Sequence, residues 1–204
     1  MSTQTWLKPE QVQSLRDACY SRRSDGITAQ RNDAIIALMY DAGVRTMETT
    51  EITVEMFDAD DKVLRLPSSI QKDYPNSGSP PPATIELART DSTKDTVRTV
   101  QNYLQSRDSS SDYLFSSERG DTITPQTIRR RIVKPAAIEA DVRPYEGYQG
   151  RAGPKDVSPY SLRHSVAYRL LSNNDGYTLY DVRNRLRHSS INTTERHYDM
   201  FDRR

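Results

Sequence analysis

Hydrophobic side chains recur every three or four residues through most of the chain, which is the period of an amphipathic helix. This pattern predicts helices over residues 9–21, 29–42, 47–52 and 91–106, and further helices that begin at residues 124–125, 158–159 and 178. Two short apolar runs, Val63–Leu66 and Thr84–Leu87, predict the strands of a hairpin around a polar, proline-rich loop. We therefore expect a mostly α fold with a small antiparallel β-sheet.

Glycine and proline residues indicate where these elements end. Gly43 follows the second predicted helix and is expected to stop it, because glycine readily adopts the left-handed conformation of a helix end. Residues 80–82 are all proline and cannot donate ladder hydrogen bonds, so the second strand is expected to begin after them. The segment 141–157 lacks a hydrophobic period and is rich in Gly and Pro, which predicts a loop. Residues 192–200 have a helix-cap candidate but little apolar periodicity.

Composition excludes several classes of protein. No apolar run approaches the roughly 20 residues that span a bilayer, so a transmembrane segment is not expected. The first eight residues have neither a basic region nor an apolar core, so we expect no secretory signal and a cytoplasmic location. Cys19 is the only cysteine, which excludes an intrachain disulfide framework and a Cys-pair zinc site. We expect Cys19 to be a half-buried helix residue.

The overall charge does not indicate a particular partner. Lys and Arg together number 29 against 28 Asp and Glu, so the formal net charge is +1. The chain has 23 arginines and only six lysines, and arginine suits bidentate phosphate contacts better than lysine does. A GC-rich genome produces the same bias, so the arginine excess has no functional weight by itself. Low lysine with abundant Asp and Arg hints at a halophilic archaeal or viral source.

Three separated fragments suggest chemistry when they are taken together. They are Gly-Val-Arg-Thr-Met-Glu at 43–48, Tyr-Ser-Leu-Arg-His at 160–164, and the segment 186–198 with Leu-Arg-His-Ser-Ser at its start. In this order, with Tyr-Leu-Phe at 113–115 ahead of Thr124 and Pro125, they resemble the tyrosine recombinases, the phage integrase family. The resemblance runs from Leu7 to the end of the chain.

The resemblance implies a fold, an activity and partners. It implies the tyrosine recombinase catalytic-domain fold, with residues 1–204 as a single catalytic domain and the amino-terminal core-binding domain absent. The family cleaves and rejoins DNA through a 3′-phosphotyrosyl intermediate without a metal, ATP or another cofactor. The implied partners are double-stranded DNA and further copies of the chain, as a dimer or tetramer on DNA, and the implied location is the nucleoid.

Catalytic roles follow from the resemblance, residue by residue. Arg45 and Arg163 match the two catalytic arginines, whose guanidinium groups neutralise the phosphate through paired hydrogen bonds. His188 matches the residue that hydrogen-bonds the scissile phosphate. Lys72 lies in the predicted hairpin loop, where the family places a general acid for the leaving 5′ oxygen, and Lys62 is the alternative.

Two positions depart from the family pattern. Tyr160 occupies the place of a histidine, and a phenol with a reference pKa of about 10 is a poor base at neutral pH, so Tyr160 either acts in catalysis or only donates a hydrogen bond. The nucleophilic tyrosine usually follows the motif histidine by nine residues, where this chain has His197. We expect the next residue, Tyr198, to be the nucleophile, through a one-residue difference in the loop. Alternatively, the active site has decayed and Tyr198 is a packing residue.

A DNA-binding surface is harder to predict. The candidates are the basic residues Arg129, Arg130, Arg131, Lys134 and Arg187. They are expected to contact DNA phosphates, although the same pattern is also typical of a solvated helix face. Because non-specific affinity comes from counterions released by positive side chains, a net charge near zero predicts weak non-specific attraction. The departures at Tyr160 and His197 favour a second hypothesis, a recombinase-derived DNA-binding regulator without catalytic activity.

Overall fold

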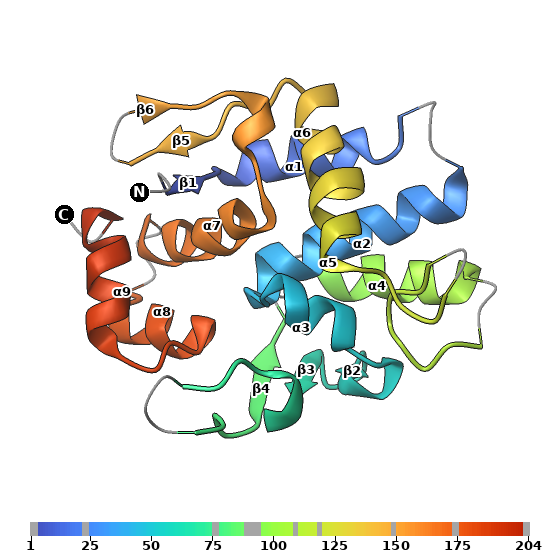
Figure 1. The fold of residues 1–204 in the computed structure, drawn as a ribbon, viewed down its shortest axis with the longest axis horizontal. Helices are drawn as coiled ribbons and strands as arrows, with labels where there is room; N and C mark the ends of the chain where they lie inside the picture. Colours follow the sequence, from blue (N-terminus) through green and yellow to red (C-terminus); the bar gives the residue numbers. More distant parts are fainter. Residues whose placement is uncertain are drawn as a thin grey trace.

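The computed structural model describes residues 4–21, 25–74, 78–87, 95–107, 110–117, 120–147, 150–172 and 176–201. Its helices are α1 (Pro9–Ala18), α2 (Gly26–Ala42), α3 (Thr46–Glu51), α4 (Thr96–Ser106), α5 (Pro125–Thr127), α6 (Lys134–Glu139), α7 (Pro159–Ser172), α8 (Leu179–Leu186) and α9 (Ile191–Tyr198). Its strands are β1 (Thr5–Trp6), β2 (Phe57–Asp58), β3 (Val63–Leu66), β4 (Ala83–Glu86), β5 (Tyr145–Glu146) and β6 (Gly150–Arg151). Figure 1 shows this order, and the prediction of a mostly α fold with small antiparallel sheets is confirmed.

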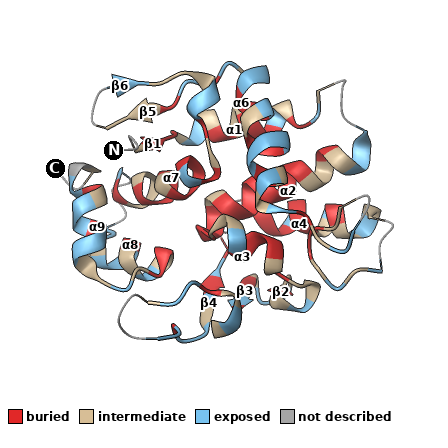
Figure 2. Ribbon diagram, in the orientation of Figure 1, coloured by how far each residue is buried: buried red, intermediate tan, exposed pale blue. Residues whose placement is uncertain are grey.

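Helix α2 lies at the centre of the core. Helices α1, α4 and α7 all pack against it, and Figure 2 shows it buried along most of its length. Ile35, Ile36, Leu38 and Met39 are fully buried, and together they leave the helix with no polar face in this stretch. A helix that is apolar all round has to be enclosed on several sides, which the three neighbouring helices accomplish.

The two small sheets differ in how well the sequence predicts them. Strands β2, β3 and β4 pair antiparallel in that order, with Val63 opposite Glu86, which confirms the predicted hairpin. Strands β1, β5 and β6 form the second sheet, so the prediction of a plain loop at 141–157 is wrong. Strands of two residues are too short to show a period, and β5 pairs with a strand near the other end of the chain.

Helix ends agree with the predictions except in detail. Gly43 ends α2 with φ of +63°, as expected. The predicted helix 91–106 begins with residues outside the described part, and α4 begins after Asp95, whose carboxylate accepts from the amide of Val97 at 2.7 Å. Helix α1 ends at Ala18, and Cys19 caps it with 4% of its surface exposed, so the expectation of a half-buried cysteine is wrong. Position 19 continues the core-facing side of α1, one turn beyond Leu15.

The segment between α5 and α6 contains a wide helical turn. Residues 128–133 are π-helical, and the amide of Lys134 donates to the carbonyl of Arg129, five residues earlier. Pro135 follows at once, and it has no amide donor and a ring that clashes with the carbonyl four residues earlier. The wide turn accommodates the proline, and π turns of this kind are frequent at functional sites.

The helices of the described residues give no indication of a membrane span: none is both long enough and apolar enough to cross a bilayer. The amino-terminal strand β1 and the carboxy-terminal helix α9 lie on the same side of the molecule (Figure 1). The ring of Phe201, just after α9, lies edge-on to Trp6 of β1, with centroids 5.0 Å apart. The two ends of the described chain therefore pack together.

Gly43→Ala should destabilise the fold. A Cβ at this position would lie 2.7 Å from Leu186 Cδ2, and an L-residue in the left-handed region costs about 1–2 kcal/mol before any clash is counted. Gly26→Ala is the matched control, since Gly26 has no atom within 4 Å of an added Cβ. In urea unfolding, we expect Gly43→Ala to lose stability and Gly26→Ala to lose none. Equal stabilities of the two variants would contradict this account of Gly43.

Candidate active site

Arg163 joins two of the sequence fragments that suggested chemistry. It lies on α7, 4% exposed, and its guanidinium donates one hydrogen bond to the carbonyl of Gly43 and another to the carbonyl of Leu186. These carbonyls terminate α2 and α8, where backbone acceptors lack helical partners and the helix dipole favours a cation. Burial, with the nearby charges of Arg45 and Arg187, lowers the pKa of Arg163 to about 9, so the side chain stays cationic at neutral pH.

Glu48 holds two further arginines with one carboxylate. Its Oε1 accepts from Arg45 Nη1 at 2.7 Å, and its Oε2 accepts from the Arg45 amide and from Arg187 Nη2, both at 2.6 Å. Arg45 also donates to the carbonyl of Arg187 at 3.2 Å. Glu48 is 1% exposed, so two guanidinium groups share one buried carboxylate, and the charge of Arg163 is near enough to help lower the pKa of that carboxylate. The excess positive charge makes this junction suited to an anion.

Arg187 is strained as well as buried. It caps α8 with φ of +54°, a conformation that is costly for a residue with a Cβ. Its side chain is 6% exposed, and its Nε has no hydrogen-bond partner among the described residues. The sequence prediction put Arg187 on a DNA-facing surface, whereas the structure turns its guanidinium inward to Glu48. Sequence spacing does not distinguish it from the half-buried Arg183 and Arg185 that precede it.

Tyr198 lies inside a group of aromatic and imidazole rings. It is 1% exposed, and its hydroxyl is 2.7 Å from Nδ1 of His164. The ring of His188 is nearly parallel to that of Tyr198, with centroids 6.1 Å apart, and His188 Nδ1 lies 2.9 Å from the hydroxyl of Thr194. Burial, together with the arginines at 45 and 163 and the neighbouring imidazoles, lowers the pKa of His188 to about 3, so this ring is neutral.

His164 is a site residue that the sequence reasoning did not single out. Its only sequence signal is position: it follows Arg163 directly and lies one helical turn after Tyr160. The rings of Tyr160 and His164 have centroids 6.1 Å apart, and Tyr160 is 63% exposed. The position predicted for a base therefore faces solvent, and the residue one turn later contacts the Tyr198 hydroxyl.

A groove of about 1210 Å³ connects this region with part of the predicted basic surface. Its lining includes Arg129, Arg130, Lys134, Lys155, Tyr160, His164 and His197. Arg131 is exposed but does not line the groove. Since successive helix residues point about 100° apart, His197 faces the groove while Tyr198 faces inward.

Lys72 makes no direct contact with the arginine cluster among the residues described. It is exposed in the loop between β3 and β4, and no hydrogen bond or ion pair joins its ammonium to any of the residues described. Lys62 lies at the turn between β2 and β3, at the opposite end of β3 from that loop. Tyr74, in the same loop as Lys72, is near enough to Arg187 for their charges to interact. Lys72 is therefore the better placed of the two predicted acids, because Lys62 lies at the other end of β3.

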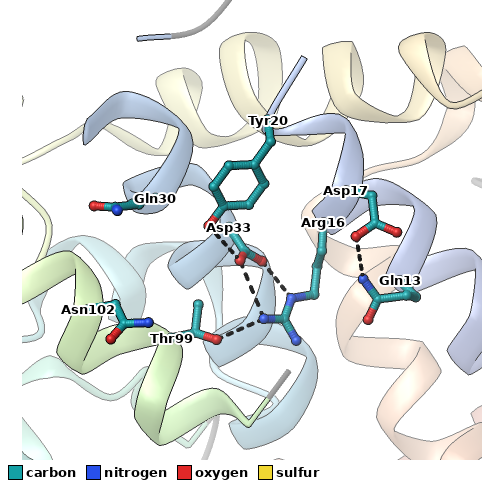
Figure 3. A pocket seen from close by; sticks show the side chains of 8 residues that line it. All are labelled: Gln13, Arg16, Asp17, Tyr20, Gln30, Asp33, Thr99 and Asn102. Atoms are coloured by element: carbon teal, nitrogen blue, oxygen red, sulfur yellow. Dashed lines mark hydrogen bonds and ion pairs between the residues drawn. The ribbon is translucent and has the colours of Figure 1, made fainter. Parts of the chain in front are cut away.

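Neither a metal centre nor a second reactive cluster is evident among the residues described. No group of three or more His, Cys, Asp and Glu side chains is arranged to hold a metal ion in the part of the chain described. Figure 3 shows a smaller pocket, of about 220 Å³, between α1, α2 and α4. There Arg16 donates to Asp33 at 2.5 Å and to Thr99 at 2.9 Å, and Tyr20 donates to Asp33 at 3.1 Å. These bonds link the three helices and leave the cluster a structural one.

Comparison with known proteins identifies the family. Residues 5–203 match the phage integrase family. The chain belongs to this family. It is 31% identical over 170 residues to the tyrosine recombinase XerC of Bifidobacterium longum (strain DJO10A), which covers 83% of this chain and 43% of XerC. It is 27% identical over 171 residues to the tyrosine recombinase XerA of Thermococcus onnurineus (strain NA1), covering 82% of this chain and 50% of XerA.

Solved structures confirm the predicted fold. The crystal structure of XerA recombinase superposes with a TM-score of 0.68 at 22% identity, over 95% of this chain and 59% of that one. The structure of XerH recombinase bound to a palindromic difH substrate, a post-cleavage complex, superposes with a TM-score of 0.67 at 18% identity. The superposition covers 98% of this chain and 51% of that one. This chain thus spans about half the length of the relatives that it matches.

Glu48→Gln should weaken the fold and change its acid sensitivity. Burial alone would raise the pKa of Glu48, but Arg187 and Arg45 outweigh it and hold the pKa below its ordinary value of 4.5. A carboxyl whose pKa is lowered on folding stabilises the protein at pH values above its pKa in the unfolded chain. This stabilisation is lost as the pH falls through the pKa of the folded state. The free energy of unfolding of the variant should be about 3 kcal/mol lower than that of wild type at neutral pH, and it should fall less steeply as the pH is lowered.

Urea unfolding between about pH 7 and about pH 3 measures both effects. Glu55→Gln is the matched control, because Glu55 is exposed and should give the wild-type profile. If stability declined as steeply with falling pH in Glu48→Gln as in wild type, the role assigned to the carboxylate would be contradicted.

Proposed function

We propose that this integrase-family chain is a tyrosine-type site-specific DNA recombinase that cleaves and rejoins strands through a 3′-phosphotyrosyl intermediate. The observation that carries the proposal is a cluster of three guanidinium groups, two of them bonded to the buried carboxylate of Glu48 and the third, that of Arg163, near enough to Tyr198 for their charges to interact. A phosphodiester is an anion of the size and charge that such donors recognise, and its charge grows in the transition state. The relatives' recombinase activities support the same conclusion.

Each side chain has a role in the proposed reaction. Arg45 and Arg163 neutralise the non-bridging oxygens, and their prior anchoring on Glu48 and on helix-end carbonyls means that little reorganisation is needed. Neutral His188 donates to the phosphate. The Tyr198 oxygen bonds to phosphorus as the bond from phosphorus to the 5′ oxygen breaks, and Lys72 gives the leaving oxygen its proton. Tyr160, exposed beside His164, donates a hydrogen bond to the substrate.

The groove supplies the DNA surface in this proposal. Its basic residues Arg129, Arg130 and Lys134 meet phosphates of double-stranded DNA, and Arg187 acts from inside through Glu48. We further propose that residues 1–204 act as one catalytic domain on nucleoid DNA and that copies associate there as dimers or tetramers. A chain with a net charge of +1 gains affinity from such association, since each copy adds its own phosphate contacts.

A specific observation favours a second function, a DNA-binding regulator without cleavage. Of the two neighbouring side chains on α9, that of His197 lines the groove, and that of Tyr198 is buried. A nicked suicide duplex incubated in EDTA separates the two functions. Covalent attachment supports the recombinase, and binding without attachment supports the regulator.

Tyr198→Phe should abolish the covalent DNA adduct. The change deletes only the hydroxyl, so the ring still packs, and stability should fall by no more than about 1 kcal/mol for the lost hydrogen bond. DNA affinity should be unchanged. His197→Ala, in the neighbouring position, should still form an adduct on Tyr198. Peptide mapping of the trapped complex is the measurement, and an adduct on His197 or on another tyrosine would refute the assignment of the nucleophile.

Arg130→Gln should weaken DNA binding and make the affinity depend less steeply on salt concentration. Loss of one phosphate contact reduces the slope of log affinity against log salt by about 1. Arg131→Gln is the matched control on the same π-helical turn, because Arg131 does not line the groove. Fluorescence anisotropy over a salt series measures both slopes. Equal slopes for the two variants would mean that the groove is not the DNA surface.

A further inference from the structure

Within the described part of the chain, His164 is the hydrogen-bond partner of the Tyr198 hydroxyl. Its Nδ1 lies 2.7 Å from Tyr198 Oη and 3.0 Å from Gln4 Nε2. Both neighbours carry hydrogens that can be donated, so the arrangement fits an unprotonated Nδ1 with the ring proton on Nε2. Burial, followed by the influence of His197 and of Arg163, lowers the pKa of His164 to about 3. The imidazole is therefore neutral, and the lone pair of its Nδ1 can accept from the Tyr198 hydroxyl at the shorter of the two distances.

The other groups near Tyr198 are less suited to take its proton. His188 lies parallel to the Tyr198 ring, and its Nδ1 is engaged by Thr194. The His197 ring centroid is 6.0 Å from that of Tyr198, and His197 lines the groove. Tyr160 is a phenol that faces solvent. Of the residues that the structure describes, His164 is the one whose acceptor atom is within hydrogen-bonding distance of Oη.

The hydroxyl needs such an acceptor. Burial raises the pKa of Tyr198 above its ordinary range, so the side chain is protonated in the resting protein. A phosphodiester bound by Arg163 brings a negative charge that offsets this arginine, and a nearby negative charge favours the protonated form of an imidazole. Substrate binding would thus make His164 more basic at the step where the proton has to leave.

We propose that His164 Nδ1 accepts the Tyr198 hydroxyl proton during DNA cleavage and returns it during rejoining. The inference rests on the proposed recombinase function. In cleavage, the bond between Oη and phosphorus forms, the bond from phosphorus to the 5′ oxygen breaks, and the Oη proton moves to Nδ1. The leaving oxygen takes a different proton, from the general acid. In rejoining, the 5′ hydroxyl gives its proton back to the general acid and its oxygen bonds to phosphorus, the bond between Oη and phosphorus breaks, and Nδ1 returns its proton to Oη. Gln4 is a positioning residue that fixes the imidazole ring.

Two substitutions separate proton transfer from positioning. In His164→Asn, the amide oxygen lies near the place of Nδ1 and still accepts a hydrogen bond, but it does not take a proton. In His164→Gln, the longer side chain leaves the Nδ1 position empty. If His164 accepts the proton, both variants should form the adduct on a nicked suicide duplex about 100-fold more slowly than wild type, with DNA affinity retained. If it only positions the hydroxyl, His164→Asn should stay within about threefold of wild type, which would overturn the proposal.

A more acidic hydroxyl at position 198 provides the decisive experiment. A ring-fluorinated tyrosine incorporated at position 198 has a more acidic hydroxyl and depends less on a base. With the fluorinated tyrosine, the ratio of the adduct-formation rates of wild type and His164→Asn should fall by about tenfold or more. The same rate ratio with ordinary and fluorinated tyrosine would overturn the proposal. Thermal unfolding checks that each variant folds, and His164→Gln serves in this arm if His164→Asn does not.

Failure of the proposed function has a different signature. If the wild-type chain binds the duplex and forms no adduct with either form of tyrosine, the recombinase function itself is refuted. If wild type forms the adduct and His164→Asn does so equally fast or faster, the function stands and the role of His164 is refuted. Faster reaction would mean that the hydrogen bond holds Tyr198 away from the substrate.

Discussion

The buried guanidinium of Arg163, bonded to the last carbonyls of α2 and α8, is the contact on which the rest of this site depends. An unpaired charge in a protein interior costs several kcal/mol, so the position is tolerable only because two helix ends point carbonyl oxygens at it. The same bonds bring together three stretches of chain that are far apart in sequence. Arg45, which follows Gly43, and His188, which follows Leu186 by two residues, are thereby held around one point.

The cluster around that point is not balanced in charge. Glu48 is the single carboxylate shared by Arg45 and Arg187, and Arg187 adopts a strained backbone conformation there. Strain and uncompensated charge persist where the surrounding structure holds them in place. An anion relieves the charge, and donors that are already oriented stabilise a transition state at little cost in reorganisation. The folded state thus holds this junction in readiness for a phosphate.

Packing at the carboxy-terminal end decides which side chain of α9 faces inward. Phe201 contacts the rings of Trp6, Tyr168 and Tyr198. Trp6 in turn stacks on Tyr168 with centroids 4.1 Å apart. Aromatic pairs of this kind contribute about 0.5–1.5 kcal/mol each beyond their buried area. They fix the rotation of α9, so that Tyr198 meets His164 while His197 faces the groove.

Local pattern was sufficient for the helices other than α9, for the β3–β4 hairpin and for the stop at Gly43, because period and turn chemistry act between near neighbours. The motif residues Arg45, Arg163 and His188 were also identifiable from the sequence. Pairing of β1 with β5, full burial of Cys19, the inward turn of Arg187 and the contact of His164 with Tyr198 were not. Each of these depends on a surface supplied by a distant part of the chain. A helical period shows which face of a helix is apolar, but not which distant segment packs against that face. The sequence alone thus determined the elements and the chemical groups, and tertiary packing decided which of those groups meet.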